Sequence, residues 1–188
     1  MQVEKFKRLD LARNGWVQTD TSKYAQELYM FFNESHIGHF FNRPVDHLAL
    51  KAADANQFDN WLEDILSTST KLSFIISDSR RLATARTKDP IFFPGLGIIK
   101  TLEIMEPRPE RVGLDLVGLD HIELLRPLDA IEFHFRMYAL PFKTQENESH
   151  KTLVLQINKE GQEVKFTEKR LLDIVQDEIL SGQATILK

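Results

Sequence analysis

The sequence predicts an α+β protein built from two successive modules, each with the order strand, helix and three further strands. The tetrapeptide Val45-Asp46-His47-Leu48 returns later in the chain as Leu119-Asp120-His121-Ile122. Each copy opens an apolar run typical of a strand, and a segment with helical spacing of its apolar residues follows each copy. Two similar units that carry a histidine at the same place in their first strand indicate a duplicated module.

The composition suits one compact core, or two half-domains that share a core. The chain has 188 residues, of which 42% are hydrophobic, and its formal net charge is −4. A surface that binds nucleic-acid phosphates normally carries a basic surplus, so we expect no nucleic-acid partner. The chain contains no cysteine, which excludes disulfides, thiolate metal ligands and a cysteine nucleophile.

The sequence also predicts a cytoplasmic protein that has no contact with a membrane. Residues 1–5 are charged and lack the apolar core of a signal peptide. No apolar stretch approaches the roughly 20 residues that a membrane-spanning helix needs. The absence of cysteine fits a reducing compartment.

Residues 1–44 are expected to form an N-terminal helical extension that lies outside the repeat. The segment 4–40 has helical character, and Thr21 or Ser22 is a candidate N-cap. The proline in 42–44 then ends the helical pattern. We expect this extension to cover part of the protein.

The first module is expected to occupy residues 45–107. Its helix is the clearest element, because five large apolar side chains between Phe58 and Leu66 fall at helical spacing. Pro107 and Pro109 end the last strand, since proline cannot continue a ladder of hydrogen bonds. The expected elements are a strand over 45–51, a helix over 55–68 and strands over 71–77, 81–87 and 98–105.

The second module is expected to occupy residues 108–188, including a C-terminal helix, and to share one structural domain with the first. Asp129 is a candidate helix cap, and Gly161 marks a hairpin turn between the last two strands. The expected elements are a strand over 119–125, a helix over 129–138, strands over 142–145, 152–158 and 162–167, and a helix that starts near Thr167.

Alternation of side chains along the strands places a group of polar residues on one face of the sheet. The apolar residues of each strand face the helices, which leaves His47 and His121 on the opposite face. Glu103, Glu123 and Lys165 are expected on that same face. A solvated face of an antiparallel sheet explains polar residues equally well. The paired histidines favour a site, since solvent gives no reason for the same residue at the same place twice.

The order and spacing of these segments resemble the vicinal oxygen chelate superfamily, which includes glyoxalase I, extradiol dioxygenases and bleomycin-resistance proteins. The closer resemblance is to its YecM-like branch, and it covers residues 20–180. The segments that carry it are Asp46-His47-Leu48-Ala49-Leu50-Lys51, Leu102-Glu103, Asp120-His121-Ile122-Glu123, Val164-Lys165-Phe166 and Ile174-Val175.

The resemblance implies that the two βαβββ modules form a curled mixed sheet around a cavity, with helices outside. In metal-dependent members the first and last strands of each module supply the ligands, which implies His47, Glu103 and His121 here. The fourth ligand position falls at Lys165, a departure from that pattern because an ammonium group repels a cation. Glu123 can supply the missing carboxylate. Alternatively, Lys165 pairs with Glu103 or Glu123, and the site holds no metal.

Two functions follow from this site. Two imidazoles with one or two carboxylates suit a divalent ion such as Zn²⁺, Ni²⁺, Mn²⁺ or Fe²⁺. The first hypothesis is a metal-dependent isomerase, lyase or dioxygenase that acts on a small oxygen-rich molecule, with Glu123 as general base if it is not a ligand. The alternative is a metal-free protein that holds a small apolar or aromatic molecule, as bleomycin-resistance proteins do. The residues leave the reaction, the metal and the oligomeric state open.

Overall fold

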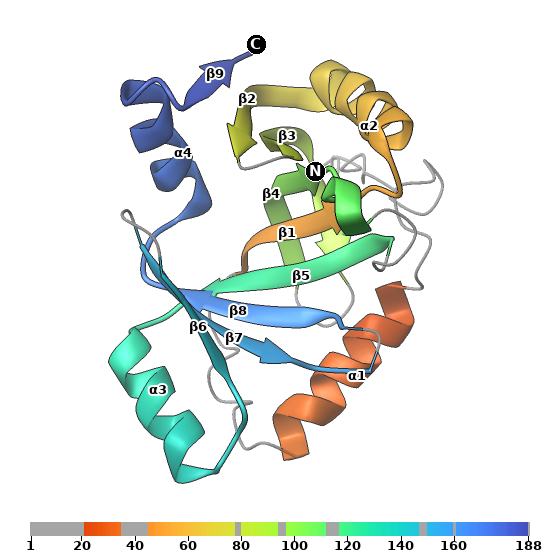
Figure 1. Cartoon of the computed structure of the whole chain (residues 1–188). Coiled ribbons are helices and arrows are strands. Elements are labelled where there is room, and N and C mark those ends of the chain that lie inside the picture. Colours follow the sequence, from red (N-terminus) through yellow and green to blue (C-terminus); the bar gives the residue numbers. More distant parts are fainter. Residues whose placement is uncertain are drawn as a thin grey trace, which may run out of the picture.

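The computed structural model describes residues 21–34, 45–77, 80–93, 97–111, 117–146, 150–159 and 161–187. These residues contain four α-helices and nine strands, and the strands form one mixed sheet (Figure 1). The α+β class and the curled sheet predicted from the sequence are confirmed. In chain order the elements are α1 (Thr21–Glu34), β1 (Val45–Lys51), α2 (Ala55–Thr68), β2 (Ser69–Ser77), β3 (Arg80–Phe93), β4 (Gly97–Met105), a 3-10 turn (Pro109–Arg111), β5 (Gly118–Leu125), α3 (Leu128–Met137), β6 (Lys143–Glu146), β7 (Lys151–Gln156), β8 (Glu163–Thr167), α4 (Leu171–Leu180) and β9 (Ala184–Ile186).

The order of the strands makes the two modules mirror each other across the centre of the sheet. The order is β6-β7-β8-β5-β1-β4-β3-β2-β9, so each module contributes four adjacent strands in the same internal order. The first and last strands of each module pair in parallel, as β1 with β4 and β5 with β8. The two first strands, β1 and β5, pair antiparallel with each other. The repeated tetrapeptides therefore lie side by side at the junction of the modules.

Helix α2 covers the outer face of the first module and begins at a well-formed cap. The Asp54 carboxylate accepts a hydrogen bond from the Gln57 backbone N–H at 2.8 Å, and the Gln57 side chain accepts one from the Ala53 N–H at 2.7 Å. The first bond satisfies an N–H group that the first turn of a helix leaves without a partner, and the second ties that turn to the residue before the cap. Phe58 and Ile65 then point into the core and are fully buried.

Helix α3 holds the equivalent position on the second module. Its first N–H group, at Leu128, donates to the Glu168 carboxylate at 2.9 Å, which ties the helix to the end of β8. Phe135 packs edge-on against Phe166 of β8, with ring centroids 5.5 Å apart, and lies 5.4 Å from the ring of Phe142. Both module helices thus bury aromatic side chains on the face of the sheet that the histidines do not occupy.

Three elements differ from the sequence-based expectation. Strand β3 continues well beyond residue 87, through an irregularity between Arg86 and Ile91 that restores its pairing with β4. The C-terminal helix begins at Leu171 and not near Thr167, because the strand β8 itself ends at Thr167. The three-residue strand β9, which the sequence did not predict, pairs antiparallel with the edge strand β2. Of the predicted N-terminal extension, the part outside 21–34 lies outside the described residues.

Helix α4 lies on the face of the sheet opposite α2 and α3. Leu171, Ile174 and Val175 are buried, and they line the same cavity as the two histidines. Strand β9 follows α4 and fastens the C-terminal segment to β2 (Figure 1). Helix α4 therefore covers the cavity side of the sheet, and β9 extends the edge of the sheet beside β2.

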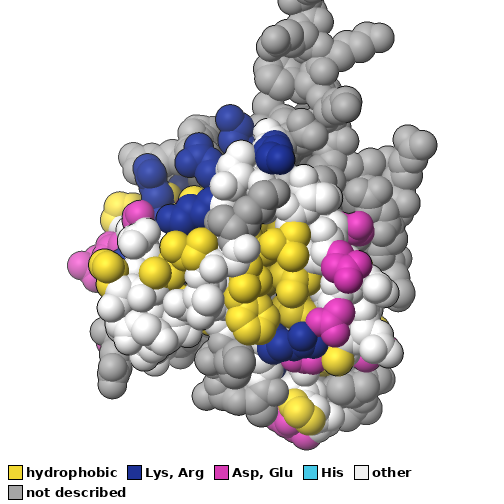
Figure 2. Space-filling view, turned by 90° about the horizontal axis from the view of Figure 1, so that it is seen from above, with side chains coloured by type: hydrophobic (Ala, Val, Ile, Leu, Met, Phe, Trp, Pro, Cys, Tyr) yellow, Lys and Arg dark blue, Asp and Glu magenta, His cyan; other side chains and the backbone are white. Residues whose placement is uncertain are grey.

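The end of the molecule that carries β9 has a partly apolar surface. Figure 2, which looks down on this end, shows apolar side chains gathered in the middle of the face, with acidic side chains beside them. Leu180, the last residue of α4, and Ile186, the last residue of β9, are 77% and 53% exposed. Among the residues that the structure describes, no helix has both the length and the apolar character needed to cross a membrane.

We expect truncation of Phe135 to destabilise the protein strongly. Phe135→Ala removes a fully buried ring between α3 and β8 and should lower the free energy of unfolding by about 3–5 kcal/mol. Urea unfolding followed by circular dichroism measures this change. Phe133→Ala is the matched control on the same helix, because that ring is 68% exposed, and it should change stability by less than about 0.5 kcal/mol. Equal losses in the two variants would contradict the packing described for α3.

Candidate metal centre

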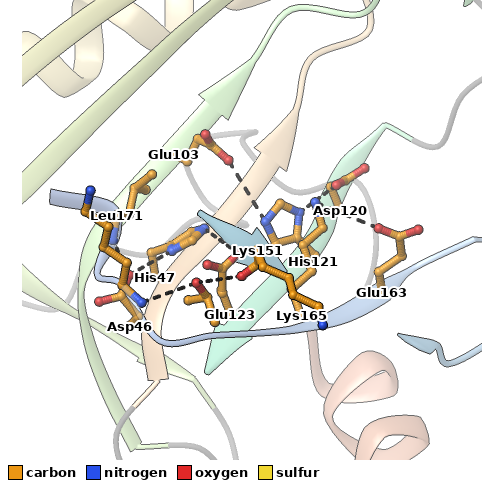
Figure 3. Close-up of polar contacts among 12 residues, drawn as sticks. Asp46, His47, Glu103, Asp120, His121, Glu123, Lys151, Glu163, Lys165 and Leu171 are labelled. Carbon is orange, nitrogen blue, oxygen red and sulfur yellow. Dashed lines mark hydrogen bonds and ion pairs between the residues drawn. The ribbon is translucent and has the colours of Figure 1, made fainter. Parts of the chain in front are cut away.

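The two histidines of the repeat meet at the centre of the sheet. In the pairing of β1 with β5, His47 lies opposite Glu123, and His121 lies opposite Ala49. Residues directly opposite each other in neighbouring strands point to the same face, so both imidazoles enter the same side of the sheet. Their ring centroids are 5.5 Å apart with the rings nearly perpendicular, and each histidine is only 2% exposed (Figure 3).

Glu103 completes a compact cluster with the two histidines. The His121 Nε2 atom lies 4.0 Å from a carboxylate oxygen of Glu103, and Ala49 separates the two residues in the sheet. One ligand atom from each of His47, Glu103 and His121 lies within 4.8 Å of the other two. In the part of the chain that the structure describes, this is the one such group of three; we call it the His–Glu triad.

The geometry of the His–Glu triad fits a divalent ion. Two ligand atoms that bind one ion at about 2.1 Å are separated by at most about 4.2 Å. The 4.0 Å distance from His121 to Glu103 is already within that limit. The other ligand-atom separations in the triad are at most 4.8 Å. A pair of imidazoles with a carboxylate is a donor set that suits Zn²⁺, Ni²⁺, Mn²⁺ and Fe²⁺.

Glu123 and Lys165 lie in a neighbouring row of the same face. Across β1, β5 and β8, His47 lies opposite Glu123, and Glu123 lies opposite Lys165. The Glu123 carboxylate is buried and reaches to 4.0 Å from the His47 Nε2 atom, but it is not one of the three members of the triad. The sequence predicted Glu123 as a ligand or, if it is not a ligand, as a general base, and its position beside His47 is compatible with either role.

The strand registers show how the two modules differ at this face. Leu48 lies opposite Leu102 in the first module, as Ile122 lies opposite Val164 in the second. One position further along, the pair Ala49 and Glu103 therefore corresponds to the pair Glu123 and Lys165. The second module thus has the Lys165 ammonium at the position equivalent to the Glu103 carboxylate. It has the Glu123 carboxylate at the position equivalent to the Ala49 methyl group.

Two aspartates that the sequence reasoning missed orient the imidazoles. The Nδ1 atom of His47 lies 3.0 Å from the Asp46 carboxylate, and that of His121 lies 2.7 Å from the Asp120 carboxylate. A carboxylate on Nδ1 fixes the ring and leaves Nε2 for a ligand, the usual arrangement around metal-binding histidines. The signal was present in the repeated Asp-His pair. It was overlooked because successive strand residues are expected to point to opposite faces.

Each aspartate is itself held by a further contact. Asp46 accepts a hydrogen bond from the Leu171 backbone N–H at 2.9 Å, which attaches the first turn of α4 to the site. Asp120 pairs with the Lys51 ammonium at 2.8 Å. These contacts restrict the rotation of the carboxylates and, through them, the orientation of both imidazole rings.

The two imidazoles have different electrostatic surroundings. Burial lowers the pKa of His121 to about 3, and the nearby Lys165 charge acts in the same direction, against the attraction of Asp120. Burial also lowers the pKa of His47, but the negative charges of Glu123, Asp46 and Glu103 outweigh it, and the net pKa is raised. Burial raises the pKa of Glu123, despite the opposing effects of His47 and Lys165. The site thus concentrates carboxylates around His47 and leaves His121 neutral.

A cavity of about 240 Å³ opens above the His–Glu triad. The sheet forms its floor, and α4 forms its cover through Leu171, Ile174 and Val175. Glu178, one turn further along α4, also reaches the cavity. His150, directly before β7, lines the cavity from the second module. His134 does not line the cavity and is buried on α3 beside the Tyr138 ring.

The paired βαβββ modules and the side chains that converge between them define a duplicated α+β protein with a candidate metal centre. A family model described as YecM protein matches residues 16–178, and the chain therefore belongs to the YecM family, as the sequence predicted. No curated protein matches the chain.

The chain is similar to several solved structures at low sequence identity, and one of them shares its fold. The structural-genomics Protein EC4020 superposes with a TM-score of 0.70 at 16% identity, covering 93% of this chain and 99% of its own. A methylmalonyl-CoA epimerase from Mycobacterium tuberculosis has a TM-score of 0.45 at 16% identity, covering 66% of this chain and 86% of its own. A fosfomycin resistance protein from Listeria monocytogenes, solved with Mn(II), has a TM-score of 0.26 at 13% identity, covering 70% of this chain and 96% of its own.

We expect Asp120 to fix the tautomer of His121. In the unaltered protein the proton should reside on Nδ1, where the carboxylate accepts it, and Nε2 should face the cavity without a proton. Asp120→Asn should produce a mixture of tautomers, because an amide side chain can donate as well as accept. Nitrogen-15 NMR of the histidine rings measures the fraction of each form. Asp129→Asn, an exposed change on α3, is the control. An unchanged tautomer in Asp120→Asn would show that other contacts orient the ring.

Proposed function

We propose that this protein is a metal-dependent enzyme of the vicinal oxygen chelate type that acts on a small oxygen-rich molecule. In this proposal His47, Glu103 and His121 hold a divalent ion at the floor of the cavity. The observation that carries the proposal is the convergence of these three side chains from both modules, with their ligand atoms within 4.8 Å of one another. Asp46 and Asp120 support it, since carboxylates on Nδ1 are characteristic of metal-binding histidines.

When bound, a divalent ion at this place polarises a substrate oxygen and stabilises the negative charge that develops on it. The protein's own residues then position the substrate and handle protons. Glu123 is the proposed general base, because its buried carboxylate lies beside the triad and 4.0 Å from His47 Nε2. Leu171, Ile174 and Val175 of α4 keep bulk water away from the site. Isomerisation, lyase chemistry and dioxygenation are all compatible with this set.

We further propose Zn²⁺, Ni²⁺, Mn²⁺ or Fe²⁺ as the metal, from the chemistry of the donor atoms. The partner is a small molecule in the cavity, and neither nucleic acid nor a membrane is part of the proposal. The proposed compartment is the cytoplasm. The modules 45–107 and 108–188 act as one unit, because the triad takes residues from both modules.

A second function is favoured by one specific residue. Lys165 occupies the position equivalent to Glu103, where its positive charge opposes the binding of a cation. A metal-free protein that sequesters a small molecule in the same cavity, as bleomycin-resistance proteins do, is the alternative. The metal content of the protein distinguishes the two functions.

The metal test uses protein purified without a histidine tag. We expect one divalent ion per chain, lost in both His47→Ala and His121→Ala, and an affinity that falls by about tenfold or more in Glu103→Gln, because each change removes a ligand. Elemental analysis and competition with a chromogenic chelator measure these values. Glu132→Gln on α3 is the control and should keep the metal. Metal-free protein under every loading condition, with unchanged stability in chelator, would establish the sequestering function.

Substitution of Lys165 tests the same site by an expected gain in metal affinity. Lys165→Glu places a carboxylate at the position equivalent to Glu103 and removes a repulsive charge, so the affinity for Zn²⁺ should rise by about tenfold or more. The control Lys169→Glu makes the same change of charge at a residue that pairs with Asp177 outside the cavity, and it should alter the affinity much less. An affinity that falls or stays constant in Lys165→Glu would contradict the equivalence of the two positions.

A further inference from the structure

The first module lines the cavity with an apolar row of side chains, and Arg80 and Thr84 of β3 also line the cavity on this side. Ile75 of β2 lies opposite Leu82 of β3, and Leu82 lies opposite Met105 of β4. These three side chains form a continuous row across three strands, and all of them line the cavity. A row of this kind contacts an apolar group well and offers no hydrogen bond.

The opposite wall, from the second module, is polar and carries a positive charge. Thr152 of β7 and Lys165 of β8 line the cavity there, together with Gln145 and His150. The Lys165 side chain is only 16% exposed, and its ammonium lies 3.9 Å from the Glu163 carboxylate, which is longer than a hydrogen bond. A partly buried ammonium with such a weak contact is well suited to pair with an anion that enters the cavity.

A comparison of equivalent positions in the two modules also supports Lys165 as a partner for an anion. At the same position the first module has Glu103, a member of the His–Glu triad. The second module therefore lacks a possible metal ligand and has instead a cation that faces the same cavity. An anionic group of the substrate can form a closer ion pair with this ammonium than the 3.9 Å contact with Glu163, whereas a neutral ligand adds none.

Helix α4, which covers the cavity, provides one hydrogen-bond acceptor. Glu178 of α4 lines the cavity, and its Oε2 atom is buried without a hydrogen-bond partner in the described part of the chain. A hydroxyl group of the substrate can donate to this oxygen. The volume of about 240 Å³ is below the range of cavities that bind drug-sized molecules, about 300–1,000 Å³, so the occupant is smaller than these.

We propose that the cavity binds a small 2-hydroxy carboxylate with a short apolar tail. Lys165 pairs with the carboxylate, the triad lies next to the adjacent oxygens, and Ile75, Leu82 and Met105 contact the tail. This assignment rests on the proposed function, since it takes the triad as the place where substrate oxygens are held. It adds the charge of the substrate and the direction in which the substrate lies across the two modules.

The test compares 2-hydroxy-4-methylpentanoate with its amide, which has nearly the same shape but no charge. Isothermal titration calorimetry on protein loaded with Zn²⁺ should show that the acid binds about tenfold or more tightly than the amide. Lys165→Met should abolish this preference and leave the zinc content unchanged. Lys169→Met, which removes a charge outside the cavity, should retain the preference.

The contact of the apolar tail is tested with lactate, a 2-hydroxy acid with three fewer carbons than 2-hydroxy-4-methylpentanoate. The longer acid should bind about tenfold or more tightly than lactate, because its tail is buried against the apolar row. Leu82→Asn should reduce this difference and preserve the preference for the acid over the amide. Equal binding of the two acids by the unaltered protein would refute the role of the apolar row.

Failure of this inference and failure of the proposed function give different results. If the unaltered protein retains zinc but binds acid and amide equally, or if Lys165→Met keeps the preference, the substrate class is wrong and the metal site stands. If the unaltered protein retains no zinc, the proposed enzyme is wrong. The same titrations in metal-free protein then decide whether Lys165 still selects the acid, as required of an anion-binding pocket, and equal binding there overturns the inference.

Discussion

The antiparallel pairing of β1 with β5 is the constraint on which the whole site depends. It joins the two modules, and its register sets His47 opposite Glu123 and His121 opposite Ala49. Because side chains alternate along a strand, a slip of one residue would turn one histidine to the helix-covered face. The apolar residues between the polar ones prevent this slip, since Leu48 and Ile122 are fully buried under the helices. These core residues therefore determine the position of the site, although neither Leu48 nor Ile122 belongs to it.

Duplication explains the convergence of the histidines, and divergence explains the chemistry of the cavity. In a strictly symmetric pair of modules the row of Glu103, Ala49 and His121 would be repeated. The second row instead contains Lys165, Glu123 and His47. The two differences compensate in charge, because Lys165 lies at the position equivalent to Glu103, and Glu123 lies next to it at the position equivalent to Ala49. The result is a cavity with a donor cluster on its floor, a cation on one wall and an apolar row on the other.

Much of this arrangement could be predicted from the sequence, because periodicity and repetition are local properties. The repeated Asp-His pair located the central strands, and alternation assigned Glu103, Glu123 and Lys165 to the face of the histidines. Two features could not be predicted in this way. The contacts of Asp46 and Asp120 with the neighbouring rings depart from simple alternation. The position of α4 depends on tertiary packing, and its apolar stripe fits either face of the sheet equally well.

The cover and the floor of the cavity share one group, the Asp46 carboxylate. The same oxygen, Oδ2, lies 3.0 Å from His47 Nδ1 and accepts the N–H of Leu171 at the start of α4. Removal of α4 from the sheet would break the second of these bonds and expose Leu171, Ile174 and Val175 to water. It would also free the carboxylate that orients one imidazole of the triad. The position of α4 and the orientation of His47 are therefore coupled through a single side chain, and the geometry of the floor depends on the closure of its cover.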